Sequence, residues 1–257
     1  MRIEEQKVVG EFFEALYRDD FQMYLQPKFF LGKEIIYGAE ALARWKKPDG
    51  TIVPPAYFID SLEKIGYITE LDFYIFEEVL KTLDKWNRQK KRKIIISTNF
   101  SGRHFEGTGE EFLNRIAHVM SKYTVLPSNV EIEVTEGVLV KNVEVLRHCL
   151  NRLHDMGFRI AIDDFGTGYS SLSMLADMPS DVIKIDKSFI NVGMTDQKLK
   201  LLCEIGRMVK ILGKEIIIEG VETKEQEQFL IDGGFACGQG FLCNRPVSLG
   251  EFERLYL

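Results

Sequence analysis

The stretch at residues 159–185, RIAIDDFGTGYSSLSMLADMPSDVIKI, holds two short apolar runs separated by a polar, glycine-bearing loop and a longer connection. The first run, RIAI, ends at a pair of aspartates, Asp163 and Asp164. The second run, VIKI, carries Lys184 between two isoleucines. Two such runs joined by a crossover are typical of a βαβ unit, in which the strands are parallel. The stretch therefore predicts a parallel sheet with charged side chains on or just after its strands.

The same alternation of strand-like runs and helical stretches continues on both sides of this unit. Helices are clearest at Phe73–Trp86 and Leu199–Leu212, where apolar residues recur three and four positions apart. This alternation predicts repeated βαβ units and hence an α/β protein with a parallel sheet. The strands expected in the series are Ile94–Ser97, Val130–Val134, Arg159–Ile162, Val182–Ile185, Glu215–Ile218 and a weaker one near Phe235–Gly238.

The start of the chain follows a different pattern. Apolar residues at helical spacing between Val8 and Tyr17 predict an amphipathic helix, which could pack on the bottom of the barrel or continue from a preceding domain. Two strand-like runs follow, Met23–Gln26 and Glu34–Ala39, and the brief segment between them is too short for a crossover. These two strands should therefore pair antiparallel.

Counting this pair, the sequence contains eight strands, the number that closes a (β/α)8 barrel of the TIM type. We expect an α/β barrel whose first strand is antiparallel to the others, with a helix over residues 1–19 and one barrel domain over residues 20–257. A doubly wound open sheet is the alternative. It would need a glycine-rich phosphate-binding turn after an early strand, and the sequence has none.

Composition excludes several classes of protein. The 257 residues carry a net charge of −6, so the basic surface of a protein that binds nucleic acid polymers is not expected. The four cysteines contain no CxxC pair, which favours free thiols over a zinc site. The chain shows neither a signal peptide nor the roughly 20 apolar residues of a membrane span. We therefore expect a cytoplasmic location and no membrane contact from this segment.

Polar residues lie on or just after the predicted strands all along the chain. The carboxyl ends of barrel strands converge on one face, where barrel enzymes have their active sites. Several carboxylates at one mouth would repel each other unless cations lie among them. Taken alone, Asp164, Glu136 or Glu222 would be a helix cap or a solvated loop residue. The series comprises Glu40, Asn99, Glu133, Glu136, Asp163, Asp164, Lys184, Glu219, Glu222 and Gln239.

The candidate metal ligands in this series are all oxygen donors. Glu40, Asn99, Glu133 and Asp163, with Asp164 and Glu219 as further candidates, suit Mg²⁺ or Mn²⁺ better than Zn²⁺ or Cu²⁺. Two metal ions bridged by an aspartate would suit phosphoryl transfer, and a metal can activate water at neutral pH without a histidine base. Lys184 could position that water or offset developing charge.

The chain contains an ordered set of short motifs: YLQP with Gln26, GAEALARW, TNFSG, EVTE, DDFGTGYSSL, KID, EGVE and QGF. The tripeptide Glu40-Ala41-Leu42 would be a weak signal alone, but the full set spans roughly residues 20 to 246. This set resembles the EAL-domain family of cyclic di-GMP phosphodiesterases.

The resemblance implies hydrolysis of cyclic di-GMP to linear pGpG with Mg²⁺ or Mn²⁺, two ions per site, and a homodimer. Glu40, Asn99, Glu133 and Asp163 resemble metal ligands, and Asp164 resembles a ligand of a second metal. Lys184 resembles the residue that contacts the catalytic water, and Glu219, Glu222 and Gln239 resemble its acid and supporting groups. Gln26, Leu42 and Arg44 resemble substrate contacts. A regulatory loop, steadied by Glu136, is implied for Phe165, Gly166, Thr167, Gly168, Tyr169, Ser170 and Ser171.

Two other functions remain open at this point. A catalytically silent receptor would bind cyclic di-GMP and leave it intact, but receptors of this kind usually lack one or more acids, and this chain lacks none. A scaffold would keep the barrel and bind no nucleotide.

Overall fold

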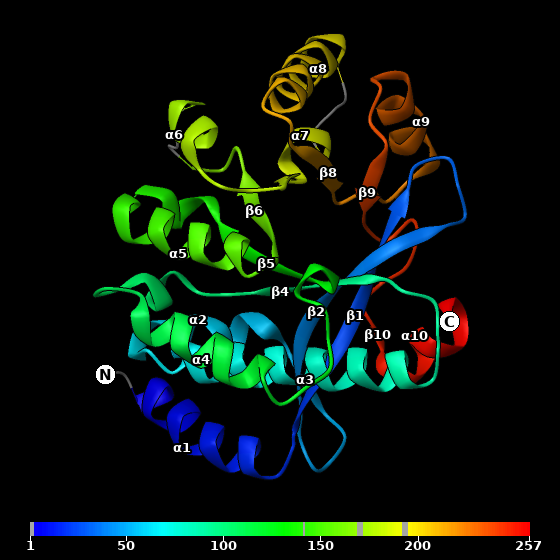
Figure 1. Cartoon of the computed structure of the whole chain (residues 1–257). Helices are drawn as coiled ribbons and strands as arrows, with labels where there is room; N and C mark the ends of the chain where they lie inside the picture. The colour runs from blue at the N-terminus through cyan, green and yellow to red at the C-terminus, as the bar shows by residue number, and fades with distance from the viewer. Residues whose placement is uncertain (1–2, 141, 169–171, 192–194) are drawn as a thin grey trace.

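The computed structural model describes residues 3–140, 142–168, 172–191 and 195–257. The described residues form a ten-stranded sheet in which the first strand also pairs with the second, so that the sheet closes into a barrel (Figure 1). Two strands of two residues each flank the eight that form the wall. The strands are β1 (Phe21–Phe30), β2 (Ile36–Lys46), β3 (Ile52–Val53), β4 (Ile95–Asn99), β5 (Val130–Thr135), β6 (Arg159–Phe165), β7 (Val182–Ile185), β8 (Glu215–Glu219), β9 (Cys237–Gln239) and β10 (Val247–Ser248).

The direction of the strands confirms the predicted barrel. β1 pairs antiparallel with both of its neighbours in the wall, β2 and β9. All other neighbours in the wall, from β2 and β4 round to β8 and β9, pair in parallel. The fold is therefore a TIM-type barrel with a reversed first strand, as the short connection between the first two strands indicated.

Helices surround the outside of the barrel (Figure 1). They bury apolar faces against the strands, and α3 is the longest example, with Phe76, Val79 and Leu80 fully buried. Short 3-10 turns occupy Gly102–Phe105, Pro127–Asn129 and Glu136–Val140. The helices are α1 (Ile3–Tyr17), α2 (Pro55–Ile65), α3 (Ile68–Arg88), α4 (Glu110–Met120), α5 (Val143–Asp155), α6 (Leu172–Asp177), α7 (Ser188–Asn191), α8 (Asp196–Ile211), α9 (Lys224–Asp232) and α10 (Leu249–Tyr256).

Several strand boundaries differ from the prediction: β1 runs from Phe21 to Phe30, and β6 runs on to Phe165, so that Asp163 and Asp164 lie inside it. Two further differences have a clear cause. β2 begins at Ile36 and runs on to Lys46, so that Glu40 lies inside the strand and not after it. The reason is the ten-residue partner β1, which pairs with β2 along almost its whole length. β9 begins at Cys237 because Phe235 closes the turn that follows α9, where its N–H donates to the Leu230 carbonyl.

Helix α1 packs beside the carboxyl end of β2 and not on the bottom of the barrel. Phe12 is fully buried, and its ring centroid lies 5.5 Å from that of Phe21. Phe21 starts β1 and pairs with Trp45 near the end of β2. Because β1 runs opposite to the other strands, its first residue lies at the rim where those strands end.

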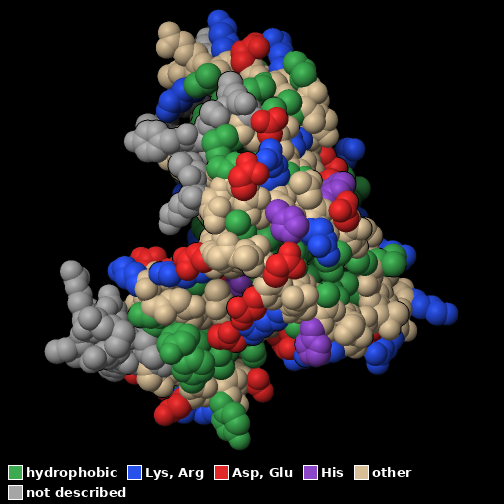
Figure 2. All heavy atoms as spheres, turned by 60° about the vertical axis from the view of Figure 1, so that its left-hand side comes forward, with side chains coloured by type: hydrophobic (Ala, Val, Ile, Leu, Met, Phe, Trp, Pro, Cys, Tyr) green, Lys and Arg blue, Asp and Glu red, His purple; other side chains and the backbone are tan. Residues whose placement is uncertain are grey.

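The outer surface shows mixed charge. On the face seen in Figure 2, the described Lys and Arg side chains lie among Asp and Glu side chains. Within the described residues, no helix combines the length and the apolar character that crossing a membrane requires.

Candidate active site

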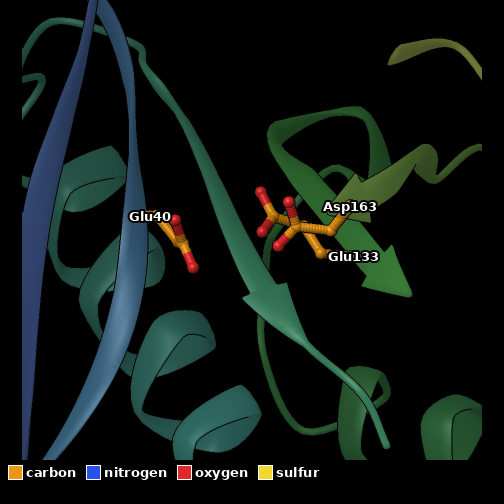
Figure 3. Close-up of side chains that lie close together, drawn as sticks. All are labelled: Glu40, Glu133 and Asp163. Carbon is orange, nitrogen blue, oxygen red and sulfur yellow. The ribbon is translucent and has the colours of Figure 1, made fainter. Parts of the chain in front are cut away.

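Strand register brings most of the predicted polar residues into one layer of the barrel interior. Gln26 pairs with Glu40, Asn99 pairs with Glu133, and Glu219 pairs with Gln239. Side chains alternate between the two faces of a strand, so paired residues of this kind point to the same side. Figure 3 shows Glu40, Glu133 and Asp163 pointing toward one another from β2, β5 and β6.

Lys184 lies at the centre of this layer. Its side chain is fully buried, and its ammonium contacts four carboxylates that come from four different strands. A buried lysine with several carboxylate partners stays protonated because each partner favours the charged form. The distances from Lys184 Nζ are 2.8 Å to Glu133 Oε2, 2.9 Å to Glu219 Oε1, 3.0 Å to Asp163 Oδ2 and 3.2 Å to Glu40 Oε2.

Two amides hold Glu40 from either side. Asn99 Nδ2 donates to Glu40 Oε1 over 2.7 Å, and Gln239 Nε2 donates to Glu40 Oε2 over 2.6 Å. Gln239 Nε2 also lies 3.2 Å from Gln26 Oε1. Both oxygens of Glu40 therefore have donors, and the Glu40 carboxylate is fixed in one orientation.

Burial and charge shift the pKa values in this layer in opposite directions. Burial alone would raise the pKa of Glu133, but Lys184 and Lys28 outweigh it and lower the pKa to about 2. Burial, opposed by Lys184, raises the pKa of Asp163 well above its ordinary value, and Glu133 adds to the rise. Burial likewise raises the pKa of Glu219. Without further cations, the layer holds more negative charge than Lys184 and Lys28 can balance.

The arrangement of the acids suits two divalent cations. One carboxylate oxygen from each of Glu40, Glu133 and Asp163 lies within 4.8 Å of the others, and the same holds for Asp163, Asp164 and Glu219. Asp163 belongs to both groups. The donors are hard oxygens, which Mg²⁺ and Mn²⁺ prefer. Gln239 Oε1 is also buried without a hydrogen-bond partner in the described residues, so this site still lacks a donor or a cation for that oxygen. The residues therefore fit the metal ions that the sequence predicts.

A local irregularity in β6 explains why two consecutive aspartates can share this site. The pairing of β6 with β7 shifts register between Ile162 and Phe165. Asp164 has a φ of 56°, and its N–H donates to Asp163 Oδ1 over 2.8 Å. In a regular strand the two side chains would point to opposite faces. Bulges of this kind often redirect a side chain near a site.

A family comparison identifies the chain. The family model for the EAL domain matches residues 10–246. The chain belongs to the EAL domain family. It is 37% identical to the signalling protein YkoW of Bacillus subtilis (strain 168), over 95% of this chain and 30% of that protein. It is 31% identical to the cyclic di-GMP phosphodiesterase PdeR of Escherichia coli (strain K12), over 95% of this chain and 36% of that protein.

Solved EAL structures agree with the fold. The PaMucR phosphodiesterase in its c-di-GMP complex is 30% identical, with a TM-score of 0.88 over 96% of this chain and 99% of that chain. The EAL enzyme Bd1971 in its cAMP and cyclic-di-GMP bound form is 31% identical, with a TM-score of 0.90 over 99% of this chain and 69% of that chain. This EAL domain spans only 30% to 36% of the length of the two curated relatives named above.

The loop after β6 of this EAL domain is held by Glu136. Glu136 is buried, and its Oε2 accepts hydrogen bonds from the Gly166 N–H at 2.8 Å and the Gly168 N–H at 3.0 Å. A β-carbon at position 168 would lie 3.1 Å from Glu136 Cδ, so a glycine at this position avoids crowding the carboxylate. Phe165 is buried and Thr167 is exposed, while Tyr169, Ser170 and Ser171 lie outside the described residues.

Two of the predicted substrate residues, Leu42 and Arg44, lie on the rim side of the cluster, and the third, Gln26, lies within its layer. Leu42 lines a pocket of about 240 Å³ together with Asn99. Arg44, two residues further along β2, is half-buried beside Tyr24, with its guanidinium 5.8 Å from that ring centroid. A larger cavity of about 720 Å³ is lined by Arg103 and neighbouring loops but by none of the clustered carboxylates, so size alone does not locate the site.

Glu222 is not brought into the cluster. Its side chain is exposed, and its backbone N–H donates to Gln226 Oε1 in the capping box that starts α9. In the described part of the chain, the Glu222 carboxylate makes no hydrogen bond or ion pair with the cluster. The N-cap of α9 is Thr223, so the exposed Glu222 side chain agrees with the solvated-loop alternative that the sequence left open.

Sequence reasoning missed two buried charged residues beneath the cluster. Lys28 Nζ lies 2.7 Å from Glu131 Oε1 and 2.7 Å from Glu133 Oε1, and both Lys28 and Glu131 are 2% exposed. One signal was available. Glu131 is two positions before Glu133 in the same strand, so the two had to share the inner face. Lys28 likewise lies two positions after Gln26 in β1, but its contacts with Glu131 and Glu133 could not be found this way, because β1 and β5 are far apart in sequence.

Proposed function

We propose that this EAL domain hydrolyses one phosphodiester bond of cyclic di-GMP, giving linear pGpG, by attack of water with Mg²⁺ or Mn²⁺ bound. The observation that carries the proposal is the pair of carboxylate groups that share Asp163, with Lys184 in contact with both. Relatives and solved neighbours named as cyclic di-GMP phosphodiesterases support the choice of substrate.

Each group of the cluster has a distinct role in the proposal. Glu40, Asn99, Glu133 and Asp163 would hold one metal ion, and Asp163, Asp164 and Glu219 would hold a second. When bound, the ions would supply Lewis-acid activation of water and of the phosphodiester, and offset the charge of an anionic substrate. Asn99 would need to turn its carbonyl oxygen toward the ion, because its amide nitrogen now faces Glu40.

Lys184 would act next to the reacting atoms. It is the described cation that contacts both carboxylate groups, so its ammonium can orient a water and offset negative charge on the phosphoryl oxygens. Glu219 reaches the same ammonium from β8 and could accept a proton from that water. Leu42, Arg44 and Gln26 would contact the nucleotide, and Arg44 offers the planar donor group that suits a phosphate or a guanine edge.

The decisive experiment is incubation of the purified protein with cyclic di-GMP and Mg²⁺ or Mn²⁺, with products resolved by chromatography. A pGpG peak that disappears with EDTA and in Glu40→Ala would support the proposal. Intact nucleotide that still binds by calorimetry would favour a silent receptor. Absence of both turnover and binding would favour a scaffold.

We also propose a homodimer, on the strength of the family resemblance alone. Light scattering behind size-exclusion chromatography should give twice the mass of the 257-residue chain. A monomer that turns over cyclic di-GMP at full rate would contradict this part of the proposal and leave the catalytic part intact.

A further inference from the structure

Charged side chains beneath the carboxylate cluster form a continuous column that runs from exposed Glu215, through partly buried Arg159, to buried Glu131 and Lys28. Arg159 Nη2 lies 3.0 Å from Glu215 Oε2, and Arg159 Nε lies 3.3 Å from Glu131 Oε2. Lys28 links Glu131 to Glu133 with two contacts of 2.7 Å. Acids and bases therefore alternate from the amino-terminal ends of β6 and β8 up to the cluster.

Within this column Glu133 is held at both oxygens by different lysines. Lys28 Nζ contacts Oε1, and Lys184 Nζ contacts Oε2 at 2.8 Å. Oε1 therefore points down the barrel and Oε2 points into the cluster. Glu133 is fully buried, so no solvent competes for the oxygen that Lys28 holds.

Lys28 is itself fixed on the other side. Glu131 accepts from Lys28 at Oε1 and from Arg159 at Oε2, so neither oxygen of Glu131 is free to move toward Glu133. Burial alone would lower the pKa of Lys28, but Glu131 and Glu133 outweigh it and raise the pKa to about 12. The ammonium is a permanent cation at neutral pH.

We propose that Lys28 is a positioning residue for the metal site: it holds one oxygen of Glu133 so that the other is presented to a divalent cation. The inference rests on the proposed function only in taking Glu133 as a metal ligand. Partners that orient a metal ligand without touching the metal commonly change metal affinity 10- to 100-fold when they are removed.

An effect of charge alone predicts the opposite change in the affinity for a divalent cation. Lys28 is a cation near the site, so its removal should tighten the binding of a divalent cation if Lys28 acted through charge alone. If Lys28 orients Glu133, its removal should weaken the binding, because Glu133 can then turn its second oxygen away from the cluster. The direction of the change therefore separates positioning from charge.

The test is calorimetric titration of nucleotide-free protein with Mn²⁺, so that no turnover is needed. We expect Lys28→Met to raise the dissociation constant for Mn²⁺ by about 10-fold or more. In steady-state assays the Mn²⁺ concentration for half-maximal rate should rise by a similar factor, while the rate at saturating Mn²⁺ changes less. Unchanged or tighter Mn²⁺ binding by folded Lys28→Met would overturn the proposal.

Two further variants separate the loss of positioning from an effect of misfolding. Lys28→Met leaves Glu131 without one partner, so the double variant Lys28→Met/Glu131→Met replaces the pair with apolar side chains, a change that often preserves folding. The double variant should lose Mn²⁺ affinity as the single variant does, and wild-type affinity in it would refute the positioning role. Lys214→Met is the matched control, because Lys214 is also buried but donates to Met178 and Ser180, away from the cluster.

The result is independent of whether cyclic di-GMP is the substrate. If the wild-type protein binds Mn²⁺ and cleaves no cyclic di-GMP, the proposed function fails, and the titrations still decide the role of Lys28. If the wild-type protein binds no Mn²⁺ at all, Glu133 is not a metal ligand and both proposals fail.

Discussion

Gln239 Nε2 donates a 2.6 Å hydrogen bond to Glu40 Oε2, across 199 residues of sequence. Gln239 ends β9 and Glu40 lies in β2, the two strands on either side of β1 in the wall. The reversed strand therefore brings the last strand of the barrel within reach of the first candidate metal ligand. The position of β1 between β2 and β9 therefore closes the sheet and also allows Gln239 to orient Glu40.

Replacing Gln239 should weaken metal binding without unfolding the protein. In Gln239→Leu, Glu40 keeps Asn99 and Lys184 as partners but loses its closest donor. We expect the Mn²⁺ requirement for turnover to rise about 10-fold and the free energy of unfolding to fall by about 1 kcal/mol. The measurements are a Mn²⁺ titration of the rate and urea denaturation. Gln228→Leu, at an exposed position on α9, is the control and should change neither quantity.

Neutralising an acid of the cluster should stabilise the metal-free protein and abolish turnover. Oxygens of Asp163, Asp164 and Glu219 lie within 4.8 Å of one another, so their charges repel. We expect Glu219→Gln to raise the free energy of unfolding in EDTA by about 1 kcal/mol and to reduce the rise in Tm that Mn²⁺ gives the wild type. Thermal denaturation with and without Mn²⁺ checks this. A lower Tm in EDTA, with the exposed control Glu204→Gln unchanged, would count against repulsion in this cluster.

Removing the Glu136 carboxylate should release the loop after β6. Glu136 Oε2 accepts from two backbone N–H groups, and hydrogen bonds to a buried charge are stronger than neutral ones. We expect Glu136→Ala to lower the free energy of unfolding by about 2 kcal/mol. Proteolysis at residues 166–168 should also become faster. Glu144→Ala, which removes an exposed carboxylate on α5, should leave both unchanged. Equal protection of the loop in both variants would show that Glu136 does not hold it.

The stability contribution of Glu227 should depend on pH. Glu227 Oε1 accepts from the Gly32 N–H at 2.9 Å in the turn between β1 and β2. Burial alone would raise the pKa of Glu227, but Lys224 and the Gly32 N–H outweigh it and hold the pKa below its ordinary 4.5. A lowered pKa stabilises the folded state above the ordinary value, and that stabilisation is lost as pH falls through the folded value.

The variant Glu227→Gln tests this dependence. At pH 7 it should be about 1 kcal/mol less stable than the wild type. Between about pH 5 and pH 3 the difference should shrink toward zero, because the wild-type carboxylate gains a proton. Urea denaturation at each pH gives both numbers. A difference that is constant over this range would mean that the charge of Glu227 contributes nothing.

The sequence predicted the barrel because its signals are local. Apolar runs with polar residues after them, and helices between them, specify each βαβ unit within about 30 residues. The reversed first strand was also predictable, since the segment around Gly32 is too short for a crossover. The boundary errors at β2 and β9 arose where pairing with the long neighbouring strand β1, or the turn after a helix, decided the bounds of an element.

Side-chain partners across the barrel were harder to predict. Alternation along β5 places Glu131 beside Glu133, but only the closed barrel brings Lys28 between them. The bulge at Asp164, with its φ of 56°, likewise depends on how β6 meets β7. Motif order indicated which residues gather, and three-dimensional closure decided which oxygen of each residue faces the cluster.

The reversed strand also determines where the chain enters the domain. In a barrel of eight parallel strands, the segment before the first strand would arrive at the rim opposite the active site. Here α1 leads into β1 at the rim where the parallel strands end, where Phe12 packs on Phe21 and the Lys46 N–H donates to the Asp20 carbonyl. A displacement of α1 would therefore reach the end of β2, six residues from Glu40, without crossing the barrel.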